Sequence, residues 1–316
     1  MKLVDVYRFF KRNTILPILL GIVIIFSIFV DRFLTLSNFT NIIEQNSAKG
    51  IMAIGMTFLI INGYFDLSVG TLLGFSASLA VGLQPLGVIP AVLIALSVGL
   101  VVGFINGFLV TIVGLNAFAV TLASMLGIRG FTYLYTKEQA IVGISDQFGA
   151  IGSGNVLGIP NLIIIFVVLL VIGQFVLKKT KHGRYTYATG GNESAANNAG
   201  INTKRITMIN FIICSFAASL GGVLYAAKMN AATPTLGWPD MHMMIIAIVV
   251  LGGTKLVGGF GNLYFTVGGL IAIGVIQNGM NLLNVQSYYN TLLTGVILIA
   301  VLYLDKIIRP TISPSR

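Results

Sequence analysis

The side chains in this sequence that could do chemistry are few, and most of them stand inside or between long apolar runs. Asp66 precedes Leu-Ser-Val-Gly, and a carboxylate at membrane depth costs about 2.5–3.5 kcal/mol on insertion scales. Two roles are open: Asp66 or Ser68 accepts backbone N–H bonds at the start of the next helix, or Asp66 contacts a transported substrate or a gate. Asn106, Asn278 and Asn281 need polar partners or water too, because a bare amide is costly in hydrocarbon. We expect all five residues to lie inside a helix bundle, along a substrate pathway.

The sequence contains no recognisable catalytic motif. His182 and His242 are isolated from each other and from any Cys or acid at a metal-ligand spacing. No HExxH, GxSxG or phosphate-binding GxxxxGK(S/T) pattern is present, so we expect no enzyme activity, no metal site and no ATP site in this chain. The single cysteine, Cys214, is most simply a small buried apolar side chain.

A polar stretch, residues 178–205, interrupts the apolar sequence with six Lys and Arg and one acid, Glu193. Asn192 is a good helix N-cap, Glu193 suits the positive end of a helix dipole, and Gly200 can end a helix. A short helix over residues 192–199 is therefore predicted. Its small side chains are Ala195, Ala196 and Ala199. Either a partner protein docks on this small face, or the loop is a solvated segment that only fixes topology.

Composition indicates the solvent in which these residues act. Of 316 residues, 56% are hydrophobic and 9% are charged, against roughly 25% charged in soluble domains. The net charge of +10 does not indicate nucleic-acid binding, because the basic residues flank apolar runs instead of forming a face among aromatics. A bilayer is the natural environment for such a chain.

The apolar runs predict an all-α polytopic membrane protein with a single domain, residues 1–316. A helix needs about 20 residues to cross ~30 Å of hydrocarbon, so the shorter runs are broken, tilted or half-spanning. About ten membrane segments are expected, near residues 15–30, 43–62, 67–83, 89–112, 117–134, 161–177, 206–227, 244–257, 263–283 and 288–304. The first lacks a small-x-small cleavage site, so we expect it to remain as an anchor.

The distribution of Lys and Arg predicts the orientation. If the N-terminus is cytoplasmic, 14 of the 19 Lys and Arg fall on the inside, including the six of residues 178–205. Both termini and this loop are then cytoplasmic. Lys49 and Arg129 lie within segments, where snorkelling to the outer interface accounts for each. Trp238 is interpreted as an outer-interface anchor, with a lid contact as the alternative.

Glycine makes up 37 of the residues, and many glycines lie inside apolar runs. Spacings such as Gly99-x-x-x-Gly103-x-x-x-Gly107 favour close helix packing. Two other stretches, residues 62–70 and 251–259, have the composition of helix breaks. Irregular backbone at membrane depth is tolerated only where it is buried in protein or lines a cavity, so both are candidates for a translocation path.

From about residue 40 to 304, the sequence resembles the monosaccharide-type permeases of ABC importers, the ribose, xylose and galactoside group. The resemblance rests on several motifs in combination. They are His182 to Ile201, Gly55-Met56-Thr57, Asp66-Leu67-Ser68-Val69-Gly70, Gly103-x-x-Asn106-Gly107, Val250-Leu251-Gly252-Gly253-Thr254 and Asn278-Gly279-x-Asn281-Leu282-Leu283.

The resemblance implies a multi-pass permease of the bacterial cytoplasmic membrane. Two such chains, identical or homologous, form a pathway; cytoplasmic ABC ATPases bind ATP and Mg, and an extracytoplasmic binding protein delivers the sugar. This chain itself binds no cofactor. The residues expected to couple to the ATPase are Gly190, Gly191, Asn192, Glu193, Ala195, Ala196, Ala199 and Gly200. Other functions left open are nucleoside or branched-chain amino-acid uptake by a similar permease, and a secondary transporter or channel that acts alone.

Overall fold

The computed structural model describes residues 15–30 and 33–286, together with a few single residues between 289 and 299. Within these residues the fold is almost entirely helical. The α-helices are α2 (Ile15–Phe29), α3 (Leu36–Ile61), α4 (Val69–Gly82), α5 (Val88–Thr111), α6 (Ala117–Thr136), α7 (Asp146–Ser153), α8 (Asn161–Lys179), α9 (Lys181–Gly191), α10 (Glu193–Asn198), α11 (Thr203–Met229), α12 (Met241–Leu251) and α13 (Leu263–Leu282). A short 3-10 helix, η1, covers Gln84–Leu86.

In the part of the chain that the structure describes, sheet structure is confined to two short antiparallel pairs. In one pair β1 (Ile141–Val142) lies against β4 (Ala231–Ala232), and in the other β2 (Asn155–Val156) lies against β3 (Ile159–Pro160). The pairing of β1 with β4 ties the segment that follows α6 to the segment that follows α11. It closes one end of the bundle.

Nine of the ten expected membrane segments contain a helix, and the tenth, near 288–304, lies outside the described residues except for a few single positions. Five described helices, α5, α6, α8, α11 and α13, are long and apolar enough to cross a membrane. Besides Leu19–Phe29 of α2, two apolar helices are too short for this: α4 has 14 residues and α12 has 11. At 1.5 Å per residue they reach only about 21 and 17 Å, so the expectation of half-spanning segments is confirmed.

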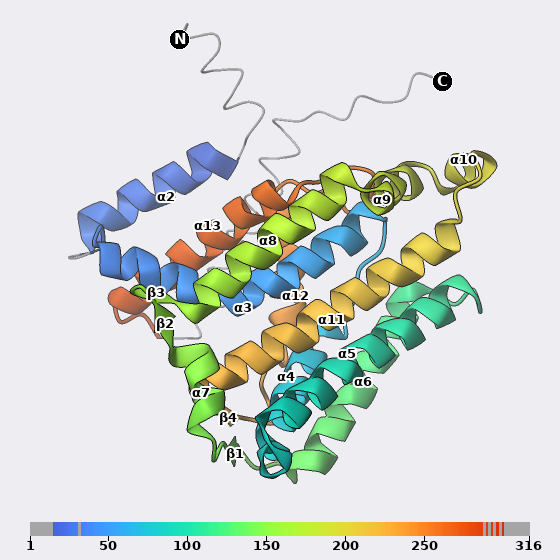
Figure 1. The fold of residues 1–316 in the computed structure, drawn as a ribbon. Coiled ribbons are helices and arrows are strands. Elements are labelled where there is room, and N and C mark those ends of the chain that lie inside the picture. Colours follow the sequence, from blue (N-terminus) through green and yellow to red (C-terminus); the bar gives the residue numbers. More distant parts are fainter. Residues whose placement is uncertain are drawn as a thin grey trace, which may run out of the picture.

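Helix α11 lies at the centre of the bundle, between α3 and α8 on one side and α5 and α6 on the other (Figure 1). Small side chains let its neighbours approach closely. A methyl group added at Gly103 of α5 would lie 2.6 Å from the Ile212 Cα atom, and one at Gly55 of α3 would lie 2.7 Å from the Ala217 Cβ atom. The prediction of tight glycine packing is confirmed, and Cys214 is fully buried in the same core.

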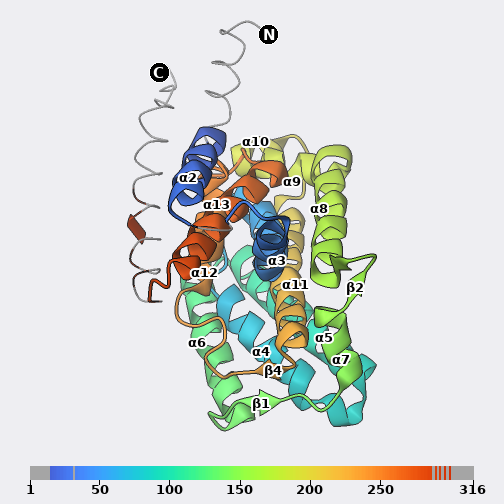
Figure 2. The same cartoon turned by 90° about the vertical axis from the view of Figure 1, so that its left-hand side faces the viewer.

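The bundle has two distinct ends. Figure 1 and Figure 2 both show α9 and α10 at one end, which we call the basic end, and α7, β1 and β4 at the opposite end. Helix α8 runs from β3 to α9, and its 19 residues correspond to about 28 Å. The 178–205 loop is therefore separated from the β2–β3 hairpin by roughly the thickness of a hydrocarbon core.

Both predicted helix breaks are real, and they meet at the basic end. Helix α3 ends at Ile61 and α12 ends at Leu251, each followed by irregular backbone. The Gly259 N–H donates to the Ile61 carbonyl oxygen at 2.8 Å. Gly63 and Gly259 have φ angles of +90° and +71°, a region that favours glycine.

The two half-helices, α4 and α12, begin next to one another inside the bundle. A methyl group at Gly70, in the first turn of α4, would lie 2.7 Å from the Gly237 carbonyl oxygen and 3.2 Å from the His242 backbone nitrogen. The segment before α12 therefore enters the bundle and reaches the start of α4.

Candidate functional site

A buried hydrogen-bond network surrounds Asp66, in the turn that precedes α4. Asp66 Oδ1 accepts the Ser68 N–H at 2.8 Å and the Ser68 hydroxyl at 2.6 Å. Asp66 Oδ2 accepts from Asn106 Nδ2 at 3.4 Å and from Ser215 Oγ at 3.2 Å. Ser124 Oγ donates in turn to Asn106 Oδ1. Three of the five expected pathway residues thus form one cluster, which joins α4, α5, α6 and α11.

This network explains how a carboxylate is accommodated in the apolar bundle. Asp66 and Ser68 are fully buried. The carboxylate accepts four hydrogen bonds, and Asn106, which donates one of them, accepts a further hydrogen bond from Ser124. The carboxylate also lies at the N-terminal end of α4, where the helix dipole favours negative charge. Of the two roles left open by the sequence, the helix cap is present only in part: Asp66 accepts the N–H of Ser68, the residue before α4, whereas the Ser68 side chain makes no capping hydrogen bond to α4. Contact of Asp66 with a substrate stays a prediction.

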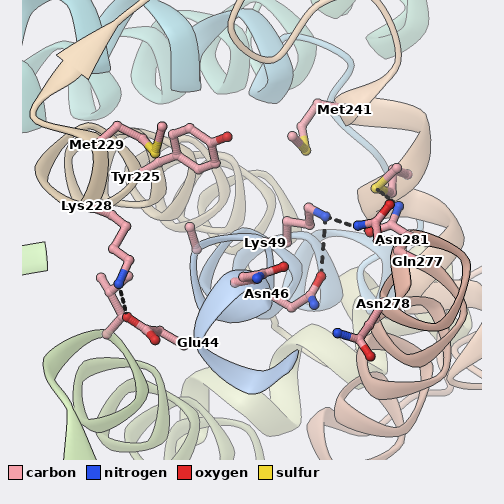
Figure 3. Close-up of a pocket in the computed structure, with 15 residues that line it drawn as sticks. Glu44, Asn46, Lys49, Tyr225, Lys228, Met229, Met241, Gln277, Asn278 and Asn281 are labelled. Carbon is pink, nitrogen blue, oxygen red and sulfur yellow. Dashed lines mark hydrogen bonds and ion pairs between the residues drawn. The ribbon is translucent and has the colours of Figure 1, made fainter. Parts of the chain in front are cut away.

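The remaining two pathway candidates, Asn278 and Asn281, lie elsewhere, in what we call the polar cavity (Figure 3). Its volume is about 550 Å³, within the range of small-molecule sites. Its lining residues come chiefly from the parts of α3, α11 and α13 that lie away from α9. They are Glu44, Gln45, Asn46, Ala48, Lys49, Leu162, Tyr225, Lys228, Met229, Met241, Met244, Gly274, Gln277, Asn278 and Asn281.

Lys49 provides the main polar contact across this cavity. Its ammonium group donates to Gln277 Oε1 at 2.9 Å and to Asn46 Oδ1 at 3.3 Å, so it links α3 to α13 (Figure 3). Lys49 lines this cavity and finds its polar partners there, so its ammonium group does not need the outer interface to be accommodated, and snorkelling stays a prediction. Lys228 pairs with Glu44 at the side of the cavity formed by the end of α11.

Amide groups dominate the rest of the polar lining. Asn278 exchanges two hydrogen bonds with Asn38, at 3.0 and 2.9 Å. Carboxamides offer both donors and acceptors, and the hydroxyl groups of a polyol require both. A cavity with several carboxamides and three methionine thioethers can bind a small polyhydroxylated molecule that also has apolar faces.

Sequence reasoning missed Asn46, Lys49 and Gln277, although a signal was available. Asn46 and Lys49 are three residues apart, and Gln277 and Asn281 are four apart, so each pair lies on one helix face. Polar residues at such a spacing within apolar helices indicate a polar face toward the bundle interior.

The 178–205 loop has the local structure that the sequence predicts. The Asn192 side chain accepts the Ala195 N–H at 2.9 Å and caps α10, and Gly200, with φ +81°, follows its end. One detail is wrong: Ala196 is only 5% exposed and packs against the protein, so it is not part of an exposed small face. Ala195 and Ala199 are exposed.

The end of α9 touches both helix breaks. A methyl group at Gly190 would clash with the Ile61 carbonyl oxygen after α3 and lie 2.8 Å from the Gly259 nitrogen after α12. The Tyr187 hydroxyl donates to the Gly261 carbonyl oxygen at 2.8 Å. We call this meeting point of residues 61–63, 190–191 and 258–261 the glycine junction. It connects the end of α9, which directly precedes Asn192 and α10, to the two broken segments.

His182 secures the other end of α9. Its Nε2 atom lies 2.8 Å from Asn210 Oδ1, and the Asn210 amide donates to Thr186 Oγ1 at 3.2 Å. Burial lowers the pKa of His182, and the hydrogen bond to Asn210 opposes this shift. The neutral imidazole is therefore the form that suits the folded protein.

Two further cavities lie apart from the polar cavity. One of about 280 Å³ is lined by Asn106 and Ser124 among apolar residues of α4, α5 and α6. Another, of about 400 Å³, is lined by Gly63, Tyr64 and Phe65 of the first break together with residues near 110–118. The first break therefore lines a cavity at the basic end, as irregular membrane backbone requires.

Arg129 and Trp238 make contact with each other. The Arg129 guanidinium lies 3.9 Å from the centre of the Trp238 ring and also donates to the Tyr133 hydroxyl. A cation–π contact of this kind holds the segment before α12 against α6.

The chain is similar in sequence to known transport proteins. The family model described as "Branched-chain amino acid transport system / permease component" matches residues 38–302. The ribose import permease protein RbsC of Escherichia coli (strain K12) is 37% identical over 293 residues, 91% of each chain.

Other curated relatives are equally extensive. The ribose import permease protein of Bacillus subtilis (strain 168) is 39% identical, over 90% of this chain and 89% of its own length. The L-arabinose transport system permease protein of Escherichia coli (strain K12) is 34% identical, over 89% of this chain and 86% of its own length. No solved structure matches the chain.

Proposed function

The chain belongs to the family of branched-chain amino acid transport system permease components, and from this premise we propose that it is the membrane permease of an ABC importer for a monosaccharide. The observation that carries the proposal is the 37–39% identity to ribose import permeases over about nine tenths of the chain. The chain is a multi-pass protein of the bacterial cytoplasmic membrane. Relatives named for ribose, allose and L-arabinose do not favour a nucleoside or an amino acid as the transported molecule.

Other subunits of the importer bind and hydrolyse ATP. Two permeases, identical or homologous, surround the pathway, and cytoplasmic ABC ATPases bind ATP and Mg. An extracytoplasmic binding protein delivers the sugar. This chain supplies the cavity, the gates and the docking site and carries out no covalent step.

The polar cavity is the part of the chain suited to receive the sugar. It lies in the half of the bundle away from the basic end, which is the outer half in the orientation that the positive charges predict. Its carboxamides match sugar hydroxyls, and its volume exceeds that of one monosaccharide. Asn278 and Asn281 would line the entry of the pathway, with Asp66, Ser68 and Asn106 fixing the half-helix α4 deeper in the bundle.

The glycine junction is the proposed route by which ATP hydrolysis opens the inner side. An ATPase that holds α10 pulls on α9, because Asn192 alone separates the two helices. Gly190 contacts the backbone after α3 and the backbone near Gly259. A shift of α9 therefore displaces both broken segments together, and these segments line or adjoin the cavity at the basic end.

Reconstitution tests the proposed function. Proteoliposomes contain the full chain, its partner permease where there is one, and the ATPase, with the binding protein on the outside. We expect uptake of a monosaccharide that requires ATP inside and resists ionophores. Uptake that is abolished by an ionophore and needs no ATPase would instead identify a secondary transporter or channel.

A charge on the exposed face of α10 tests the docking part of the proposal. Ala195→Arg should abolish both transport and the stimulation of ATP hydrolysis by the loaded binding protein, since a charge buried at an interface without a partner costs several kcal/mol. The matched control is Leu157→Arg, which adds the same charge at a site that is 98% exposed in the β2–β3 turn. Equal stimulation in both variants would show that the loop serves only topology.

A further inference from the structure

The ammonium group of Lys49 in the polar cavity is held by neutral oxygens alone. Its hydrogen-bond acceptors are the carboxamide oxygens of Asn46 and Gln277. In the part of the chain that the structure describes, the one ion pair is Lys228 with Glu44, so the carboxylate of this cavity is already used. A half-buried cation inside a membrane protein normally has a charged partner or a function.

A second acid, Asp240, does not supply that partner. Asp240, just before α12, acts on Lys49 through space but forms no ion pair with it. Its side chain is exposed, so water and salt screen its charge. The polar cavity therefore keeps one positive charge from Lys49 that its own lining does not neutralise.

We infer that the transported molecule is a sugar acid, whose single carboxylate binds the ammonium group of Lys49. The inference rests on the proposed function, because it names the substrate class of the same importer. The carboxamides of Asn46, Gln277 and Asn278 surround Lys49 and would receive the hydroxyl groups of the sugar. The thioethers of Met241 and Met244 would cover its C–H face.

The donor set favours a carboxylate over a phosphate. Phosphate sites in proteins gather several charged or backbone donors, and arginine is preferred for bidentate contacts. Here the ammonium of Lys49 stands among neutral amides, and none of the described residues that line the cavity is an arginine. One positive point charge balances one negative charge, which is the charge of a sugar acid near neutral pH.

The test compares three pairs of probes in the reconstituted importer with its ATPase and binding protein. The neutral sugars are D-ribose, D-allose and L-arabinose, and the acids are D-ribonate, D-allonate and L-arabinonate. D-Ribose 5-phosphate is the phosphate arm. Since the same binding protein is used throughout, a change in kcat/KM between permease variants belongs to the permease.

Three variants make the test specific for the charge. Lys49→Gln keeps a polar side chain but removes the charge, and Lys49→Arg keeps the charge. Lys137→Gln is the matched control, because it removes an exposed positive charge outside the cavity, at the end of α6.

We expect ATP-driven uptake of at least one sugar acid. Lys49→Gln should lower its kcat/KM about tenfold or more, the usual effect of losing a hydrogen bond to a charged group. Lys49→Arg should retain most of the uptake, and Lys137→Gln should equal the wild type.

The opposite outcomes are distinguishable. ATP-driven uptake restricted to neutral sugars, unchanged by Lys49→Gln, would overturn the inference and leave the proposed function standing. Preference for the phosphate over the acids would overturn the carboxylate assignment. If Lys49→Gln weakened docking of the binding protein without changing the ratio of acid to neutral uptake, Lys49 would serve that protein and the inference would be wrong. Absence of ATP-driven uptake for every probe would contradict the proposed function itself.

Discussion

At the scale of single residues, Asp66 shows how one buried acid can organise several helices. Its two carboxylate oxygens accept from Ser68, Asn106 and Ser215, which belong to different parts of the chain. A buried donor that loses its acceptor costs about 1–3 kcal/mol. The stability of the start of α4 therefore depends on this side chain, whatever its contact with the transported molecule.

We predict that Asp66→Ala lowers the free energy of unfolding by about 1–3 kcal/mol, because the donors around the carboxylate lose their acceptor. Thermal unfolding of the purified protein in detergent would measure the effect. Asp146→Ala is the control, since Asp146 is exposed in the first turn of α7. A melting temperature of Asp66→Ala equal to that of the wild type would show that the network adds no stability.

The lowered pKa of His182 predicts that the stability of the protein depends on pH. Because burial lowers its pKa below the ordinary value of about 6.5, the unfolded chain binds more protons than the folded protein just below that value. Its stabilising contribution is full above pH ~6.5 and is lost as the pH falls through that value. His182→Gln should make the melting temperature less sensitive to pH between about 7.5 and 5.5.

The control for this experiment is within the chain. His242, the only other histidine, is present in both proteins, so its own titration cancels in the comparison. Identical pH profiles for the wild type and His182→Gln would contradict the assignment of His182.

At the scale of elements, the sequence predicted the features that arise from local chemistry. Asn192 caps α10 and the breaks after α3 and α12 occur where glycine is dense, since a cap or a positive φ depends on a few neighbouring residues. The contact between those breaks could not be predicted, because Ile61, Gly190 and Gly259 are far apart in sequence.

Other elements were missed for a similar reason. Helix α9 contains three glycines and no apolar stripe, so its helical structure depends on contacts such as those of His182 and Tyr187. Ala196 looked equivalent to Ala195 in sequence, yet only packing against the protein decides which of them is exposed. In the polar cavity, Asn278 and Asn281 were expected, whereas the role of Lys49 depends on the position of Gln277 across the bundle.

The glycine junction provides a prediction at this scale. Gly190→Ala should impair transport strongly, because the added methyl group would clash with the Ile61 carbonyl oxygen, a backbone atom that cannot move without shifting α3. Gly191→Ala is a closely matched control, since nothing lies within 4 Å of a methyl group there. Both variants would be compared for ATP-driven uptake at equal amounts in the membrane.

The transport activities of the two variants show whether the glycine junction transmits motion. If the junction transmits the motion of α10, Gly190→Ala should lose transport while the ATPase still binds, and Gly191→Ala should resemble the wild type. Equal activities would show that α9 can separate from the two breaks without consequence for transport.

At the scale of the whole molecule, charge separates the two ends of the bundle. The basic end carries six Lys and Arg in residues 178–205, whereas the β2–β3 hairpin carries no charged residue. Basic loops remain in the cytoplasm, so this asymmetry predicts that the polar cavity faces the outside and the glycine junction faces the cytoplasm, where we propose that the ATPase binds. The proposed import requires this arrangement, because the sugar must arrive at one end and the work of ATP hydrolysis at the other.

Cysteine accessibility tests that orientation directly. The only native cysteine, Cys214, is fully buried, so the labelling of introduced cysteines can be measured with little background from Cys214. Asn197→Cys lies in α10 at the basic end, and Leu157→Cys lies in the β2–β3 turn, across the length of α8. Both native side chains are exposed. A membrane-impermeant thiol reagent should therefore label Cys at 157 in intact cells, and label Cys at 197 only after the cells are opened. Labelling with the opposite pattern would reverse the orientation, and the polar cavity would then face the cytoplasm, where a binding protein could not deliver its sugar.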